Sequence, residues 1–280
     1  MTTLSCAVLL AAGLAAGPSV HAGQATPAAP ALVARAIEAM GGESVLQAIK
    51  TIEIEGMGHA YALEQSERPE GPYLVSYHQI SEIRDHAGAR FRRKQEQRNW
   101  SVPNWAGAAI VGVDGIAAVN LGGQWRPHQP QQLSQIRRDM DLAPERLLFT
   151  ARAAADLRLA PGRDLHGIAN HAVAFTHDGQ HLTLYFNSHS HMPTMLQSVE
   201  EDVFGIWGEV TRERWYTFWT LQPGGWQYPQ QITTTWNGLP SADQTVFAIK
   251  ANAPIDETLF AVPDDTKAAF RKALEGPARP

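Results

Sequence analysis

The sequence predicts an α+β domain in which a large antiparallel sheet curls around a small helical layer. Two observations support this fold class. Long β-branched and aromatic runs are separated by Gly, Pro and Asn, most clearly in the three strands and short closing element between Glu209 and Pro263. Helical periodicity replaces the strand pattern in the middle of the chain and near both ends.

The composition indicates an ordinary globular protein. Of its 280 residues, 44% are hydrophobic and 18% are charged, which is enough apolar material for a core. The formal net charge of −5 and the isoelectric point near 6.1 argue against nucleic acid as a partner, because such partners select basic surfaces.

Residues 1–22 are expected to be a signal peptide. Ala7–Ala16 is an apolar run too short to span a bilayer, and Val20-His21-Ala22 places small residues where a signal peptidase cuts. No Lys or Arg precedes this run, which departs from the usual signal. Cleavage would remove Cys6, the only cysteine, so the mature periplasmic chain would have no disulfide. An Ala/Pro linker, residues 23–30, follows.

Two helices and several strands are predicted next. Helix-spaced apolar residues fill Ala31–Met40, which ends at Gly41-Gly42, and Glu43–Ile49 is a second short helix. Further strands are expected at Thr51–Leu63, Tyr73–Arg84, Ala89–Trp100, Ala108–Leu121 and Gln124–His128, with turns at Asp114-Gly115 and Gly122-Gly123.

Arg90–Arg98 is polar on both faces. We interpret it as a solvated edge strand whose charges block aggregation. Two alternatives are a basic rim for an anionic ligand and the contact edge of a module that binds a protein partner.

A helical insert is predicted at about residues 130–157, followed by a second set of strands. Its helices are Pro130–Asp141 and Ala143–Leu157. The strands are Ile168–Phe175, Leu182–Phe186, Met195–Asp202, Gly208–Leu221, Trp226–Trp236 and Gln244–Lys250, with hairpin turns at Asp178-Gly179, Pro223–Gly225 and Asn237-Gly238. Residues 264–280 form a C-terminal helix, Asp264–Leu274, and a tail.

Several stretches carry a family resemblance: Ala39–Gly56, Arg214–Trp219, Tyr228-Pro229, Thr245-Val246 and Asp256–Pro263. Through them the chain resembles the periplasmic lipoprotein-carrier (LolA/LolB-like) fold. More closely, it resembles the N-terminal module found ahead of some bacterial metallo-β-lactamase-fold hydrolases, here as a stand-alone chain. The resemblance covers about residues 31–263 and rests on structural motifs, so it transfers fold better than function.

The resemblance implies a half-open β-barrel with helices on its concave side and an apolar cavity that, in carriers of this type, binds acyl chains. It also implies that residues 31–263 form one domain.

No catalytic residue or cofactor is predicted. The sequence has no Gly-x-Ser-x-Gly elbow, no phosphate-binding glycine loop and no cysteine after the signal peptide. Histidines at four positions could form a metal clip, but we interpret them as polar residues at hairpin tips, which loops carry freely. They are His177, His181, His189 and His191.

An aromatic set in the last strands is the better candidate for ligand binding. Trp215 and Trp219 are expected to share one face of a strand, and Trp226, Tyr228 and Trp236 to share one face of the next. These side chains would either fill a core or line an apolar pocket with polar groups. Two neighbouring arginines, Arg212 and Arg214, could neutralise an anionic headgroup or remain solvated.

The first functional hypothesis is an exported periplasmic protein, without a transmembrane segment, that binds a hydrophobic small molecule or lipid and catalyses no reaction. The alternative is an accessory partner of a metallo-β-lactamase-fold hydrolase, or a hydrolase-type enzyme.

Overall fold

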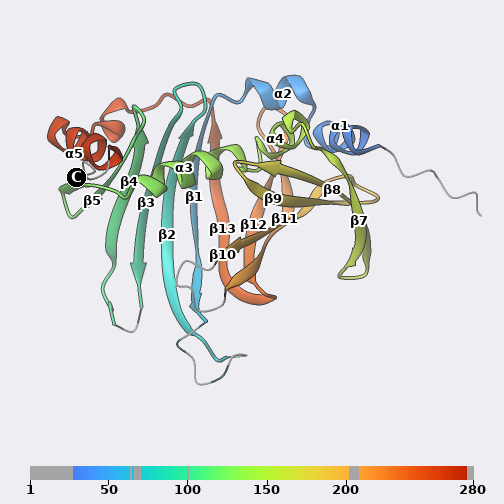
Figure 1. Ribbon diagram of the computed structural model, residues 1–280, viewed down its shortest axis with the longest axis horizontal. Helices are drawn as coiled ribbons and strands as arrows, with labels where there is room; N and C mark the ends of the chain where they lie inside the picture. Colours follow the sequence, from blue (N-terminus) through green and yellow to red (C-terminus); the bar gives the residue numbers. More distant parts are fainter. Residues whose placement is uncertain are drawn as a thin grey trace, which may run out of the picture.

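The computed structural model describes residues 28–63, 65, 68, 71–99, 101–201 and 208–275. The predicted signal peptide and residues 23–27 of the predicted linker lie outside this part of the chain. The described strands form one 13-stranded antiparallel sheet in the order β6-β5-β4-β3-β2-β1-β13-β12-β11-β10-β9-β8-β7 (Figure 1). This arrangement confirms the α+β class with a large, open, curled sheet.

The strands are β1 (Thr51–Ala62), β2 (Leu74–Asp85), β3 (Arg90–Arg98), β4 (Ala106–Val113), β5 (Ile116–Leu121), β6 (Gln124–Pro127), β7 (Arg158–Leu165), β8 (Ile168–His177), β9 (Gln180–Asn187), β10 (Pro193–Glu201), β11 (Glu209–Gln222), β12 (Trp226–Trp236) and β13 (Leu239–Ala251). The helices are α1 (Ala29–Ala39), α2 (Glu43–Ala48), α3 (Pro130–Asp141), α4 (Leu147–Ala153), the 3₁₀ turn η1 (Glu257–Phe260) and α5 (Asp264–Leu274).

Three sequence interpretations need correction. Strand β3 is not an edge strand, because it pairs with β2 on one side and β4 on the other. The helix predicted to reach Leu157 ends at Ala153, and β7 follows, with Pro161-Gly162 at an irregularity in its register. A proline is tolerated there because β7 is the outermost strand. Helix α1 begins at Ala29, inside the predicted linker, with Pro30 in its first turn.

Helix α3 shows that the sheet is curled. A Cβ added to Gly112 of β4 would lie 3.1 Å from Cγ2 of Ile136, while Asp139, one turn further along α3, lies 3.8 Å from Arg214 of β11. Strands β4 and β11 are six strand-to-strand steps apart, or about 29 Å in a flat sheet. Residues three apart on a helix are separated by only about 4.5 Å along its axis. The sheet therefore bends around α3, and we call the face that α3 covers the concave face.

Helices pack on both faces of the sheet, mostly toward one end of the strands (Figure 1). A first core cluster joins apolar side chains of α1, α2 and α4 to concave positions of the strands, including Ile52, Val173 and Tyr228. On the opposite, convex face, Arg90 of β3 stacks over Phe260 of η1, and α5 packs against β5 and β6. The resemblance implied helices on the concave side, and the helices on the convex side are an addition to it.

Two glycines in β1 allow close contact with β13 beside an irregularity in the pairing between Glu55 and Gly56. A Cβ at Gly58 would lie 1.9 Å from the carbonyl oxygen of Asp243, and one at Gly56 would lie 2.8 Å from that of Thr245. A side chain at either position would push the two strands apart. Such irregularities increase the local twist, so these residues contribute to the curl.

We expect Gly58→Ala to lower the free energy of unfolding by about 1–3 kcal/mol, because the added methyl group overlaps the β13 backbone. Urea unfolding, monitored by circular dichroism, measures this change in the free energy of unfolding. Gly107→Ala is the matched control, since the nearest atom to its Cβ is Cγ of the Glu96 side chain at 3.0 Å. Equal stability of the two variants would contradict the close-contact explanation.

Candidate ligand-binding site

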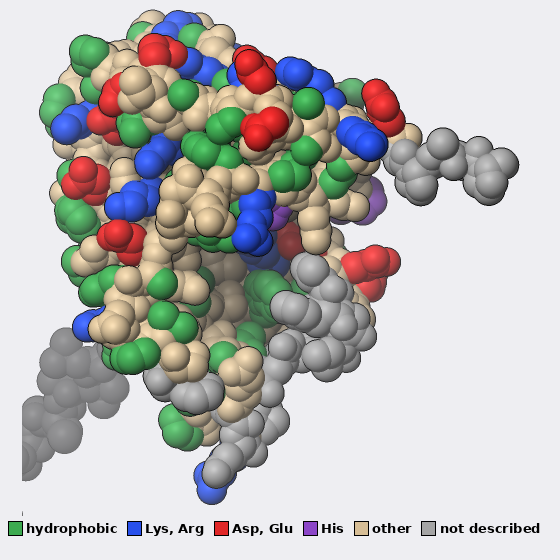
Figure 2. Space-filling model, turned by 90° about the vertical axis from the view of Figure 1, so that its left-hand side faces the viewer, with side chains coloured by type: hydrophobic (Ala, Val, Ile, Leu, Met, Phe, Trp, Pro, Cys, Tyr) green, Lys and Arg blue, Asp and Glu red, His purple; other side chains and the backbone are tan. Residues whose placement is uncertain are grey.

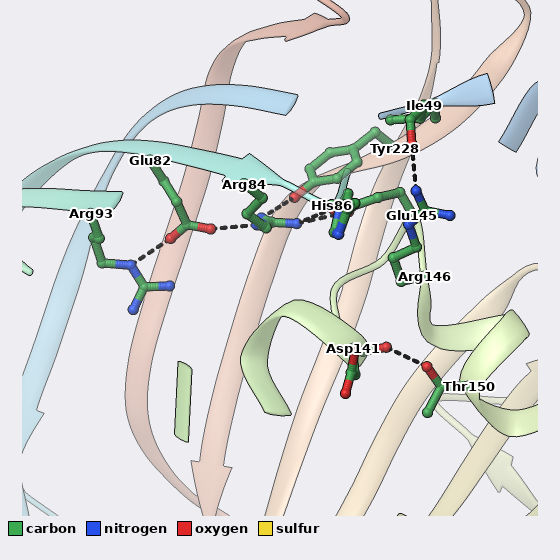
Figure 3. A network of polar contacts seen from close by, with 10 residues as sticks. All are labelled: Ile49, Glu82, Arg84, His86, Arg93, Asp141, Glu145, Arg146, Thr150 and Tyr228. Carbon is green, nitrogen blue, oxygen red and sulfur yellow. Dashed lines mark hydrogen bonds and ion pairs between the residues drawn. The ribbon is translucent and has the colours of Figure 1, made fainter. Parts of the chain in front are cut away.

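The centre of the concave face carries a buried ionic network around Arg84 of β2 (Figure 3). Its Nε atom donates to Glu82 at 2.5 Å, Nη1 donates to both oxygens of Glu145 at 2.6 and 2.7 Å, and Nη2 donates to the hydroxyl of Tyr228 at 3.1 Å. Glu82 also accepts from Arg93 of β3. Each nitrogen of the Arg84 guanidinium therefore has a partner.

Glu145 connects this network to the helices. It lies in the turn between α3 and α4, its side chain is fully buried, and it is also 3.0 Å from Nε2 of His86. Burial alone would raise the pKa of Glu145, but Arg84 and His86 outweigh it and lower the pKa to about 2. The neighbouring Arg146 donates to the carbonyl of Ile49. These contacts hold the α3–α4 turn against the sheet.

The network is a satisfied structural cluster rather than an open reaction centre. Glu82 and Arg84 are 3% and 6% exposed. Burial opposes the charge of Glu82, yet Arg93 and Arg84 lower its pKa. Buried, paired charges of this kind are costly to break, because the remaining partner stays buried without compensation.

Beside the network, the concave face is hollowed. A cavity of about 460 Å³ lies between α3, the β8–β9 turn and strands β9–β11, and its lining includes Arg138, Asp139, Ser198, Glu200, Arg212 and Arg214. A second cavity of about 340 Å³ lies over β3–β5, lined by Gln95, Gln97, Ala106, Ala108, Ile110 and Leu121. Figure 2 shows the molecule hollowed in its lower half, away from the helical end, with hydrophobic side chains inside the recess. The lining is mixed rather than apolar throughout.

The predicted ligand-binding residues are divided between this hollow and the core. Arg212 and Arg214 line the larger cavity, and Trp236 is the cross-strand partner of Arg212. Trp226 and Tyr228 are core residues, 2% and 1% exposed; the indole of Trp226 donates to Pro223 and the hydroxyl of Tyr228 accepts from Arg84.

Trp215 and Trp219 do not share a face, so that prediction is wrong. Trp215 packs with Leu165, Ala172, Tyr185 and Met195 on the convex side, whereas Trp219 packs against the concave core and stacks 6.2 Å from the ring of Tyr216. Between them Phe218 has a φ of +53°. This left-handed residue interrupts the strand alternation.

The four candidate histidines are not brought together. His177 and His181 flank the β8–β9 turn, where they contact Asp141 and Thr176 respectively. His189 and His191 lie beyond the other end of β9, an eight-residue strand. Within the described residues, no group of three or more His, Cys, Asp and Glu side chains is arranged to hold a metal ion.

Sequence reasoning missed Glu82, Arg84, Glu145 and Tyr216. The alternation of charged and apolar residues in β2 was a usable signal, because Glu82 and Arg84 pair across strands with the isoleucines Ile54 and Ile52 of β1. Cross-strand partners share a face, so charges opposite core isoleucines imply buried charges.

The pH dependence of stability tests the role of Glu145. Its pKa is lower in the folded state than its ordinary value, so its stabilising contribution is complete above about pH 4.5 and is lost as the pH falls toward 2. This contribution is about 3 kcal/mol.

We expect Glu145→Gln to be less stable at neutral pH and to show a shallower loss of stability between pH 4.5 and 2. Urea titrations across this range measure both effects. Glu43→Gln should change the acid profile much less, because its pair with Arg152 lowers the pKa of Glu43 but is exposed and screened by solvent. An unchanged profile in Glu145→Gln would reject the assignment.

Comparisons with known proteins show the fold alone. No family model and no curated protein matches the chain. A crystal structure of a DUF1329 family protein from Desulfovibrio piger aligns with 88% of this chain and 100% of its own, at 11% identity and a TM-score of 0.53. A putative outer membrane lipoprotein-sorting protein domain from Vibrio parahaemolyticus aligns with 87% of this chain and 99% of its own, at 8% identity and a TM-score of 0.49. That second score is too low to support an argument. None of the helices in the described parts of the chain is both long and apolar enough to cross a membrane.

Proposed function

We propose that this protein is exported to the periplasm, where it binds a hydrophobic or amphiphilic molecule in the hollow of its concave face and carries out no chemistry on it. Export rests on the predicted signal peptide. The observation that carries the binding proposal is the hollow itself, with cavities of about 460 and 340 Å³ on the face that α3 spans.

The size and lining of the hollow support this function. Sites for small molecules enclose about 300–1,000 Å³ and combine apolar walls with a few polar groups. Over β3–β5 the walls are small and apolar at Ala106, Ala108 and Ile110, which suits a hydrocarbon chain. Near β11 they carry Arg212 and Arg214, which suits a polar end. The two cavities share no lining residue, so an amphiphile that matches both would extend across the concave face between them.

The fold resemblance supports the same proposal. In the lipoprotein-carrier-like architecture that the sequence resembles, the concave side of an open sheet binds acyl chains. Here α3 lies between the two halves of the sheet, against Gly112 of β4 and near Arg214 of β11. The buried Glu145–Arg84 pair holds the turn that follows it. The hollow therefore has a shape before any ligand enters, which lowers the entropic cost of binding.

The direct test is to purify the protein without detergent, extract it with organic solvent, and titrate the delipidated protein with a fluorescent fatty acid. We expect a co-purified lipid or saturable binding. Ala108→Phe should weaken binding by about tenfold or more, because the ring fills space that the ligand uses. Ala109→Phe is the matched control, since Ala109 does not line this cavity. It borders a depression next to Thr258 and Leu259 of η1 on the convex face, which Ala108 also borders.

Two outcomes would contradict the proposal. One is a protein that carries no lipid and shows no saturable binding after delipidation. The other is an equal loss of binding in the Ala108→Phe and Ala109→Phe variants, which would show that the ligand does not bind in the hollow.

A further inference from the structure

Two arginines face the larger cavity from alternate positions of β11. Arg212 and Arg214 have side chains that are 27% and 20% exposed. Burial and the neighbouring charge of Arg214 lower the pKa of Arg212, so the two cations are held close at an energetic cost. The two arginines place positive charge on one wall of a cavity that four acidic residues also line. These are Asp139, Asp178, Glu200 and Glu201.

The partners of these arginines are incomplete, in contrast to those of Arg84. Nη1 of Arg212 lies 3.5 Å from Glu200, and Nη2 of Arg214 lies 3.8 Å from Asp139. Charge-assisted hydrogen bonds are about 2.7–2.9 Å long, so both contacts are loose ion pairs. Arg84, on the same face, makes its contacts at 2.5–3.1 Å. One arginine is therefore structurally saturated and two retain binding capacity.

A buried polar atom of the pair also lacks a partner. In the described part of the chain, Nε of Arg212 is buried without a hydrogen bond. The hydroxyl of Tyr216, which is 2% exposed, lies beside the Arg214 guanidinium, and burial raises its pKa, which keeps it neutral. An unsatisfied buried donor costs stability, and a bound acceptor would satisfy Nε of Arg212.

We propose that Arg212 and Arg214 form a subsite for the anionic headgroup, a carboxylate or a phosphate, of the amphiphile bound in the hollow. This inference rests on the proposed function and specifies its ligand class. Guanidinium groups bind both anions through paired N–H donors. Leu182 and Leu196 line the same cavity and would contact the first carbons of the attached chain.

Glu200 and Asp139 act as exchangeable counter-charges in this arrangement. Their contacts with the arginines are long, and Glu200 also accepts a hydrogen bond from Ser198 at 2.7 Å. An incoming anion would replace these carboxylates as the partner of the arginine pair. Removing one of them should therefore strengthen anion binding, which a purely structural role for the arginines would not produce.

Isothermal titration of the full-length, delipidated protein with three probes tests the subsite. The probes, each kept below its critical micelle concentration where one exists, are dodecyl phosphate, dodecyl maltoside and inorganic phosphate. We expect dodecyl phosphate to bind more tightly than dodecyl maltoside. Arg212→Gln and Arg214→Gln should weaken the binding of dodecyl phosphate about 10- to 100-fold, the loss expected for a charge-assisted hydrogen bond. The affinity for dodecyl maltoside should stay unchanged.

Two further variants sharpen the test. Glu200→Gln should strengthen dodecyl phosphate binding several-fold. Arg163→Gln is the matched control, because Arg163 pairs with Glu213, which lies between the two arginines but on the other face of β11. If Arg214→Gln fails to fold, Arg212→Gln and the comparison of the two dodecyl probes on the wild-type protein still decide the question.

The outcomes are distinguishable. Equal binding of both dodecyl probes, unaffected by the arginine variants, would reject the headgroup subsite and keep the proposed function. Binding of inorganic phosphate as tight as that of dodecyl phosphate, with the same dependence on the arginines, would support the anion site and assign it to a free anion. Absence of binding by any probe would reject both the subsite and the proposed function.

Discussion

The ion pair between Glu145 and Arg84 attaches the α3–α4 turn to the centre of the concave face. Helix α3, which precedes this turn, lies between the two halves of the sheet, with Ile136 against β4 and Asp139 near β11. Arg84 also donates hydrogen bonds to Glu82 of β2 and Tyr228 of β12. One buried guanidinium therefore connects the α3–α4 turn to two strands of the sheet. The dimensions of the hollow follow from this attachment.

The concave face uses arginine in two different ways. Around Arg84, carboxylates and a tyrosine hydroxyl saturate the guanidinium, and the cluster is rigid. Around Arg212 and Arg214 the carboxylates lie further away, and Nε of Arg212 has no partner among the described residues. Both clusters are on one sheet, a few strands apart, and burial of charge is common to them. The structural cluster and the candidate binding cluster differ in how completely the N–H donors of their arginines are hydrogen-bonded.

The sheet, its strand order in the last third and most helices could be predicted from the sequence, because alternation and turn residues are local signals. Whether a strand lies at the edge or in the centre of a sheet is not encoded by local sequence. The composition of β3 is typical of an edge strand, yet β3 pairs on both sides. Arg84 and Glu145 are 61 residues apart, and only the folded sheet joins them. Trp219 changes face through the positive φ of Phe218, a feature that aromatic spacing does not reveal.

The strand order has a consequence for how the chain folds. Every neighbouring pair in the sheet is consecutive in sequence except β1 and β13, which pair Ile52 with Ala251 and Ala60 with Ala242. The β1–β6 meander and the β7–β13 meander can each form from local contacts, whereas the seam between them closes a long loop and is entropically slow. During synthesis, β1 can pair with β2, but its other edge must wait unpaired until β13 has been made. Aggregation through this strand edge must therefore be prevented while the chain folds, because the edge is paired in the finished sheet.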